Sequence, residues 1–395
     1  MADTAQRPSN FSDHQLGIYA GGMFANQVPA ITTDLAHLEE HARGILSDEA
    51  TGYIVASAGS GDTARANRDA FAGWRILPRM LRGSADRDLS CTVLGAAMPA
   101  PVLLAPVGVQ TLAHPEGELA SARAAAALGL TYVHSTQASR SFEQVAEASG
   151  EGSRWYQLYW PNDLEMCVSF LDRARASGFS VLVLTLDTGQ IGWRPADLDR
   201  GYLPFLANLG IANYLSDPVF LASLAKPVAE DPQAAALRFA QVFGNLTLSW
   251  SQLPFLREHW DGPIVLKGIC AVEDAELAAE HGVDGIVVSN HGGRQVDGAL
   301  AALDALPAVV DAVGDRLTVL FDSGVRTGAD AFKAIALGAE AVLIGRPFLY
   351  GLALAGQDGV EHVLRCLLAE LDLTLALSGY GSHRELDRRS VVRSG

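Results

Sequence analysis

The stretch VVSNHGGRQVDG, residues 287–298, places two ionisable side chains directly after an apolar run. Within it, His291 and Arg294 are each costly to bury without a partner. The two glycines between them, Gly292 and Gly293, allow the backbone to turn sharply or to approach a ligand. Such a pair by itself more often belongs to a polar loop that caps a strand than to a functional site. The rest of the sequence has to decide between these interpretations.

Seven further apolar runs end in the same way, with polar side chains or glycines that could bind a ligand or move a proton. These residues are Gly108, Ser135, Thr136, Gln157, Tyr159, Thr185, Asp187, Lys267, Asp322, Gly324, Arg326, Gly345 and Arg346. One such residue could simply anchor a loop. The same feature at the end of all eight runs indicates a site.

The runs themselves predict buried parallel strands. They span residues 101–107, 131–135, 155–159, 181–187, 263–269, 285–290, 318–324 and 341–345. They are too short for buried helices and too uniformly apolar for a sheet with one wet face. Alanine-rich helical stretches lie between most of them, so the sequence predicts an α/β fold, a (β/α)8 TIM barrel. Active sites of such barrels lie at the C-terminal ends of the strands, where these polar residues would meet.

Two regions fall outside this repeating pattern. Residues 1–99 are expected to form an extension of helices and loops on the bottom or rim of the barrel, which itself spans residues 100–380. Residues 195–262 are too long for one strand–helix unit, and a long insertion between the fourth and fifth strands is typical of an active-site lid. The insertion could also form contacts in an oligomer. Residues 381–395 are expected to be a C-terminal tail.

The last two predicted strands are each followed by glycine and arginine, in DSGVRTGAD and IGRPFLYG. Loops at these positions of a barrel commonly bind phosphate through backbone N–H groups and a helix N-terminus. Arg326 and Arg346 could bind the phosphate oxygens or form ion pairs with carboxylates at the rim. Because both stand beside glycines on adjacent strands, a ligand that carries phosphate is favoured. A dinucleotide on a Rossmann unit is not expected, since no G-x-G-x-x-G joins a strand to a helix.

Composition and charge exclude several classes of partner. The 395 residues carry a formal net charge of −16, which argues against nucleic acid or an anionic membrane as the main partner. The four cysteines lie far apart and form no C-x-x-C pair, so neither a disulfide framework nor a metal site is expected. The sequence shows no signal-peptide pattern and no apolar stretch of membrane-spanning length, and a cytoplasmic protein is expected.

The motifs YQLY, LTLDT followed by GWR, LKGI, SNHGGRQ, DSGVRTGAD and IGRP occur in this order along the chain. Together they resemble the FMN-dependent α-hydroxy acid oxidase and dehydrogenase family. Within that family the resemblance is closest to the lactate 2-monooxygenases, through GWRPADL, PFL, NYLSDPVF and the glycine of APVGV, Gly108. The similarity runs from about Tyr53 to the ALSG motif near residue 376, so it covers nearly the whole chain.

The resemblance implies that FMN binds across the barrel mouth, with its phosphate in the two glycine–arginine loops. The cofactor-binding residues that it implies are Pro106, Val107, Gly108, Ser135, Gln157, Thr185, Lys267, Ser289, Asp322, Ser323, Gly324, Arg326, Gly345 and Arg346. Lys267 would stabilise the negative charge of the reduced flavin. The alternative for a lysine at a strand end is the Schiff-base nucleophile of a lyase, which leaves His291 and the arginines without a role.

The resemblance also implies a small L-2-hydroxy acid as the substrate. The implied substrate-binding residues are Tyr53, Tyr159, Arg194 and Arg294, and the implied catalytic residues are His291, Tyr159, Asp187 and Lys267. The arginines and Tyr53 would bind the carboxylate, and Tyr159 the α-hydroxyl. His291 would take a proton from the hydroxyl or, in a second route, from the α-carbon, with Asp187 stabilising the imidazolium.

The expected function is that of an L-lactate 2-monooxygenase, which converts lactate and O2 into acetate, CO2 and water. Gly108 would leave room for oxygen, although a glycine there could also serve a backbone turn. The alternative is an oxidase that releases the 2-keto acid and hydrogen peroxide, and a non-catalytic barrel is disfavoured because the expected site residues are present. Gln137 departs from the family pattern, and Trp160, Leu203 and Phe205 are considered for the pocket without being assigned. Family likeness suggests a homo-oligomer, a tetramer or an octamer.

Overall fold

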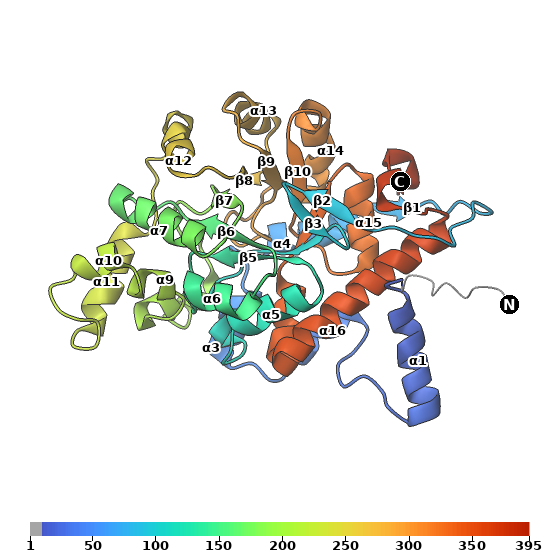
Figure 1. Ribbon diagram of the computed structural model, residues 1–395, viewed down its shortest axis with the longest axis horizontal. Coiled ribbons are helices and arrows are strands. Elements are labelled where there is room, and N and C mark those ends of the chain that lie inside the picture. Colours follow the sequence, from blue (N-terminus) through green and yellow to red (C-terminus); the bar gives the residue numbers. More distant parts are fainter. Residues whose placement is uncertain (1–9, 395) are drawn as a thin grey trace.

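The computed structural model describes residues 10–394 and contains a closed barrel of parallel strands (Figure 1). The barrel strands are β4 Val102–Leu104, β5 Thr131–Ser135, β6 Arg154–Leu158, β7 Leu182–Thr185, β8 Ile264–Ile269, β9 Gly285–Val288, β10 Thr318–Phe321 and β11 Ala341–Ile344. They follow one another around the barrel in chain order, and β11 pairs with β4 to close it. Each strand overlaps one predicted run, so the predicted (β/α)8 barrel is confirmed.

Helices alternate with the strands and cover the outside of the barrel (Figure 1). They are α5 Glu118–Ala127, α6 Phe142–Ser149, α7 Leu164–Ala176, α12 Leu253–His259, α13 Val272–Glu280, α14 Ala302–Val313, α15 Gly328–Ala336 and α16 Arg346–Ser378, with short 3-10 turns η2 Gln110–Leu112 and η4 Trp250–Gln252. The backbone of α16 leaves the helical conformation at Ala355 and Gly356. No helix among residues 10–394 combines the length and the apolar character that crossing a membrane requires.

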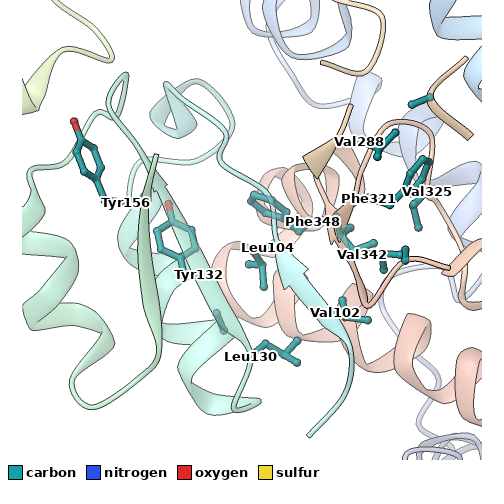
Figure 2. Close-up of a cluster of buried hydrophobic side chains, with 14 of the residues drawn as sticks. Val102, Leu104, Leu130, Tyr132, Tyr156, Val288, Phe321, Val325, Val342 and Phe348 are labelled. Carbon is teal, nitrogen blue, oxygen red and sulfur yellow. The ribbon is translucent and has the colours of Figure 1, made fainter. Parts of the chain in front are cut away.

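Two apolar layers stabilise the barrel, because alternate side chains of a strand face the barrel interior and the surrounding helices. The outer layer includes Leu104, Tyr132 and Val342, and Phe348 of α16 packs in the same cluster (Figure 2). The inner layer contains Leu103, Val133, Trp155, Val183, Val265, Val287, Leu320 and Leu343. A hairpin of β2 Cys91–Val93 and β3 Ala96–Met98 packs against this inner layer and closes the N-terminal end of the barrel.

The same alternation positions the site at the opposite end. Two positions after the inner apolar residues, the inward-facing positions are occupied by Ser135, Gln157, Thr185, Lys267, Ser289, Asp322 and Gly345. The strand period of two therefore carries polar groups and a glycine from seven strands to the C-terminal mouth.

The insertion between β7 and β8 forms short helices beside the barrel (Figure 1). They are α8 Pro195–Leu198, η3 Pro204–Ala207, α9 Ala212–Leu215, α10 Pro218–Ala222 and α11 Pro232–Val242. Asp217 and Asp231 cap α10 and α11, and each is followed by a proline at the first helical position. Aromatic contacts hold the helices together, with the rings of Tyr214 and Phe239 5.0 Å apart.

The segment before the barrel reaches both of its ends. It contains α1 Asp13–Ala25, η1 Leu35–His37, α2 Leu38–Arg43, α3 Asp48–Val55, α4 Asp62–Ala72 and β1 Trp74–Ile76, before the β2–β3 hairpin. Helix α3 packs against α8 and brings Tyr53 to the mouth. At the C-terminus, η5 His383–Glu385 and η6 Arg388–Ser390 precede β12 Val391–Arg393, which pairs with β1.

Candidate active site

The polar strand ends line a cavity at the barrel mouth. The predicted site residues that line it are Tyr53, Pro106, Val107, Gly108, Ser135, Tyr159, Arg194, Lys267, His291, Arg294, Asp322, Ser323, Gly324, Arg326, Gly345 and Arg346. Gln157, Thr185, Asp187 and Ser289 stand directly behind this lining, each paired or hydrogen bonded to a lining residue. The structure therefore brings the predicted site residues together at one end of the barrel.

His291 follows β9 in a left-handed backbone conformation, with φ of 59°. Its main-chain N–H donates to Ser289 Oγ at 3.0 Å, and its Nδ1 lies 2.8 Å from Asp187 Oδ1. Thr188 Oγ1 donates to the same carboxylate oxygen at 3.0 Å. Because Nδ1 faces a carboxylate, Nδ1 carries the proton of the neutral ring, and Nε2 keeps its lone pair.

The charges of this pair are set by burial and by each other. Burial lowers the pKa of His291 below its ordinary value, although Asp187 favours the imidazolium. Burial opposes ionisation of Asp187 as well, but His291 and Lys267 outweigh it and hold the pKa of this carboxyl below its usual value. At neutral pH the cavity therefore contains a neutral imidazole, able to accept a proton, beside an ionised carboxylate.

Arg294 is a partly buried cation without a carboxylate partner among the described residues. Its Nη1 donates to the main-chain oxygens of Tyr53 and Ala56, each at 2.8 Å, and the guanidinium carbon lies 5.3 Å from the centre of the Tyr53 ring. Burial, with repulsion from Arg194 and Arg346, lowers the pKa of Arg294 to about 9. An anionic ligand in the cavity would relieve this unfavourable burial of positive charge.

Arg194 comes to the cavity from the start of the insertion, and Gln295 holds it there. Arg194 Nε donates to the main-chain oxygen of Arg294 at 3.0 Å, and Nη2 donates to Gln295 Oε1 at 2.7 Å. Gln295 Nε2 donates in turn to the main-chain oxygen of Asp187 at 2.9 Å. Gln295 is the last residue of the SNHGGRQ motif, but the motif alone does not predict its role.

Lys267 is held by two neighbours inside the barrel. Its Nζ lies 3.0 Å from Asp322 Oδ2 and donates to Ser289 Oγ at 2.9 Å. Burial disfavours the ammonium, but Asp322 and Asp187 outweigh burial and raise the pKa of Lys267 above its ordinary value. A lysine kept protonated is not the free amine that a Schiff-base lyase needs, so the geometry favours a fixed positive charge.

The loop after β10 is held in a left-handed backbone conformation by hydrogen bonds to its neighbouring loop. Ser323 and Gly324 both have positive φ, 80° and 100°. Ser323 Oγ accepts hydrogen bonds from the main-chain N–H groups of Asn290 and Gly292, at 3.2 and 3.0 Å. The loop is therefore fixed before any ligand arrives.

Arg326 and Arg346 flank this loop. Arg346 donates to the main-chain oxygens of Gly292 and Ala56, both at 3.1 Å, and within residues 10–394 neither guanidinium forms an ion pair with a carboxylate. Burial and repulsion from Arg346 lower the pKa of Arg326 to about 10. The alternative of rim ion pairs is therefore not realised, and the two cations remain available to a phosphate.

Several buried polar atoms around the cavity lack a hydrogen-bond partner that a ligand could provide. Gln157 Nε2, Thr185 Oγ1 and Arg346 Nε have no hydrogen-bond partner in the part of the chain that the structure describes. An unpaired buried donor is costly, by about 1–3 kcal/mol. FMN carries a phosphate ester together with carbonyl and ring-nitrogen acceptors, and the residues present fit this group.

The structure supports a backbone role for Gly108, the second of the two roles expected for it. A Cβ atom at Gly108 would lie 2.5 Å from the main-chain oxygen of Gln137, closer than real Cβ contacts. The glycine is therefore required by the close approach of the loops after β4 and β5, and the missing methyl group does not by itself open space for oxygen.

Three apolar residues complete the cavity: Ile191, which precedes the insertion, and Phe205 and Phe243, which belong to it. The Phe243 ring lies 5.7 Å from that of Tyr159, and the Phe205 ring 6.2 Å from that of Tyr53. Trp160 and Leu203 are not among the lining residues. Phe243 belongs to no motif, and only the packing of the insertion brings it to the mouth.

The family model described as FMN-dependent dehydrogenase matches residues 42–393. An FMN-dependent alpha-hydroxy acid dehydrogenase of Penicillium citrinum is 48% identical over 389 residues, 98% of this chain and 97% of that protein. An L-lactate oxidase of Lysinibacillus sphaericus is 45% identical, over 87% of this chain and 88% of its own length. The crystal structure of mandelate oxidase with (S)-4-hydroxymandelic acid is similar with a TM-score of 0.82 and 38% identity, covering 92% of this chain and 99% of that one.

Proposed function

This chain belongs to the FMN-dependent dehydrogenase family, as an enzyme of the α-hydroxy acid group. We propose that its substrate is a small L-2-hydroxy acid with an apolar side chain, such as L-lactate. The observation that carries the proposal is the single cavity in which a proton acceptor, His291, and two arginines, Arg194 and Arg294, meet. One end of a hydroxy acid needs a base and the other end needs a cation, and this cavity offers both.

Binding of the substrate carboxylate falls to the arginines. A bound carboxylate would stabilise the desolvated positive charge of Arg294. Arg194 is already oriented by its hydrogen bond to Gln295. A guanidinium can bind both carboxylate oxygens, which fixes the orientation of the acid as well as its position. Tyr53 lines the cavity beside Arg294 and would add its hydroxyl.

Proton transfer falls to His291. FMN, when bound, supplies the chemistry of accepting the two electrons that leave the substrate. His291 Nε2 accepts the proton, from the α-hydroxyl or in the second route from the α-carbon, while Asp187 at 2.8 Å from Nδ1 stabilises the imidazolium. Tyr159 would hydrogen-bond the α-hydroxyl, and Lys267 holds a positive charge at the barrel axis.

The substrate side chain is expected to face the apolar part of the wall. Ile191, Phe205 and Phe243 offer no charge to a second carboxylate or an amine. This lining supports an alkyl or aryl hydroxy acid over a dicarboxylic one, because an unpaired charge buried against phenyl rings is costly.

We propose the monooxygenase outcome, in which lactate and O2 give acetate, CO2 and water. The support is that Phe205 and Phe243 of the insertion form part of the cavity wall, so the keto acid would be retained until oxygen has reacted. The alternative is an oxidase that releases pyruvate and hydrogen peroxide, and the likeness to an L-lactate oxidase keeps it as the second candidate.

A product assay separates the two outcomes. Under air, with catalase present to remove free peroxide, L-lactate should yield acetate in proportion to the oxygen consumed. Stoichiometric pyruvate would show instead that the enzyme is an oxidase.

We also propose that the protein works in the cytoplasm as a homo-oligomer, a tetramer or an octamer, with no nucleic-acid or membrane partner. The support is the net charge of −16, the four unpaired cysteines and an exposed apolar face on α1.

A further inference from the structure

A cluster of two histidines and a cysteine lies where α1 meets α16. His14 belongs to α1, and His362 and Cys366 stand one turn apart on α16. None of the three lines the cavity at the barrel mouth. Within residues 10–394 this is the group of histidine, cysteine or acidic side chains with the arrangement of a metal site, and its three ligand atoms all lie within 4.8 Å of one another.

The two sulfur–nitrogen distances in the cluster are close to those around a tetrahedral zinc ion. Cys366 Sγ lies 3.8 Å from His14 Nε2 and 3.6 Å from His362 Nε2. With a Zn–S bond of about 2.3 Å and a Zn–N bond of about 2.0–2.1 Å, tetrahedral geometry separates sulfur and nitrogen ligands by about 3.5 Å. To bind an ion, the sulfur–nitrogen distances would have to shorten by only a few tenths of an ångström, and the two ring nitrogens lie within 4.8 Å of each other.

The backbone that presents His14 is fixed by other contacts. The main-chain N–H of Ser12 donates to Asp372 Oδ2 at 2.8 Å, and Arg87 forms an ion pair with the same buried carboxylate. Arg87 Nη2 also donates to Ser12 Oγ at 2.8 Å. Asp372 lies on α16, so the hydrogen bonds of Ser12 hold the start of α1 against the helix that carries the other two ligands. The site is thus assembled in part before a metal arrives.

We propose that His14, His362 and Cys366 bind a zinc ion. A thiolate and two imidazoles suit zinc, and water completes the tetrahedron, since both imidazoles are only partly buried. His362 Nε2 lies 3.1 Å from the main-chain oxygen of Thr32, which can only accept, so this nitrogen donates its proton there. Zinc binding releases the thiol proton of Cys366 to solvent, and His362 carries its ring proton on Nδ1 so that Nε2 can coordinate.

The site would fasten α1 to the barrel. No residue within Asp13–Ala25 is buried, and the helix projects from the molecule beside α16 (Figure 1). Beyond the Ser12 contact, little apolar packing orients it. A zinc ion that joins α1 to α16 would fix this orientation, so the proposed role is structural.

The test uses the flavin-loaded enzyme, stripped of metal with a chelator and dialysed against Zn2+. We expect one zinc per chain by elemental analysis, and slower hydrogen exchange of the α1 amides when zinc is present. In the Co2+-loaded enzyme we expect the visible bands of tetrahedral cobalt at wavelengths where flavin does not absorb. Cys366→Ser and His14→Gln should each lose the zinc and the exchange protection, with the rate of lactate oxidation unchanged.

Cys91→Ser is the matched control, because Cys91 is another unpaired cysteine but lies outside the cluster. This variant should keep one zinc per chain. The proposal is overturned if the wild-type enzyme retains no zinc, or if Cys366→Ser and His14→Gln bind as much as Cys91→Ser.

Discussion

At the scale of single residues, the site depends on buried charges that the chain leaves incompletely matched. Arg294 and Arg326 have lowered pKa values, about 9 and about 10, because they are buried near other cations. His291 is the opposite case, since a carboxylate 2.8 Å away keeps a buried imidazole ready to take a proton. The types of these residues were predictable from their motifs. Their partners Thr188 and Gln295 were not, because a hydrogen bond across the site leaves no spacing pattern in the sequence.

Asp187→Asn tests the pair at this scale. Burial already lowers the pKa of His291, and Asp187 partly offsets this shift, so its loss should lower that pKa further. The neutral ring is the active form, so wild-type kcat/KM falls as pH drops through a pKa below the ordinary value of 6.5. In the variant this fall of kcat/KM at acid pH should move to lower pH. The pH-independent value of kcat/KM should decrease about 100-fold, because the imidazolium loses its carboxylate partner.

Thr188→Val is the control, since it removes one hydrogen bond to the carboxylate and keeps the charge. Its pH profile should stay close to that of the wild type. An unchanged acid limb in Asp187→Asn would remove Asp187 from its assigned role.

At the scale of elements, the apolar runs predict the strands but not the residues at which the hydrogen-bonded strands end. The run at residues 101–107 predicts one strand, whereas β4 ends at Leu104. Pro106 has no N–H to donate, so the last residues of the run turn into the mouth instead. Phe243 could not be placed at all, because its position depends on how the insertion packs and not on any local pattern.

Gly359→Ala tests the packing of α16 with itself. A Cβ at Gly359 would lie 1.9 Å from the main-chain oxygen of Gly351, so the two halves of the interrupted helix would have to separate. We expect a loss of about 1–3 kcal/mol in the free energy of unfolding, measured by denaturant titration.

Gly17→Ala provides the comparison, because a Cβ there meets nothing within 4 Å. Alanine is the better helix former, so this variant should be neutral or more stable by up to about 1 kcal/mol. Equal stabilities for the two variants would show that the Gly351–Gly359 approach does not constrain the fold.

At the scale of the whole molecule, the β2–β3 hairpin covers the N-terminal end of the barrel, and the candidate site lies at the C-terminal end. Helix α1 projects from the barrel away from both ends. On that helix Leu16, Tyr19, Met23 and Phe24 are 63%, 60%, 79% and 89% exposed. An apolar face of this kind is typical of an interface, and a second copy of the chain is the proposed occupant.

Replacing Met23 and Phe24 by serine should weaken this assembly. Light scattering at matched concentration should give a mass of several chains for the wild type and a smaller mass for the double variant. A monomeric wild type, or an unchanged mass in the variant, would contradict the oligomer proposal.

The most direct measurement of the central claim is flavin bleaching in the absence of oxygen. Wild-type enzyme mixed with L-lactate, or with another small L-2-hydroxy acid of apolar side chain, should lose its yellow colour. His291→Gln should retain FMN and bind a carboxylate ligand through Arg194 and Arg294, but bleach about 10²–10⁴-fold more slowly, because the proton acceptor is gone. A near-normal bleaching rate in His291→Gln, or no bleaching of the wild type by any such acid, would contradict the account.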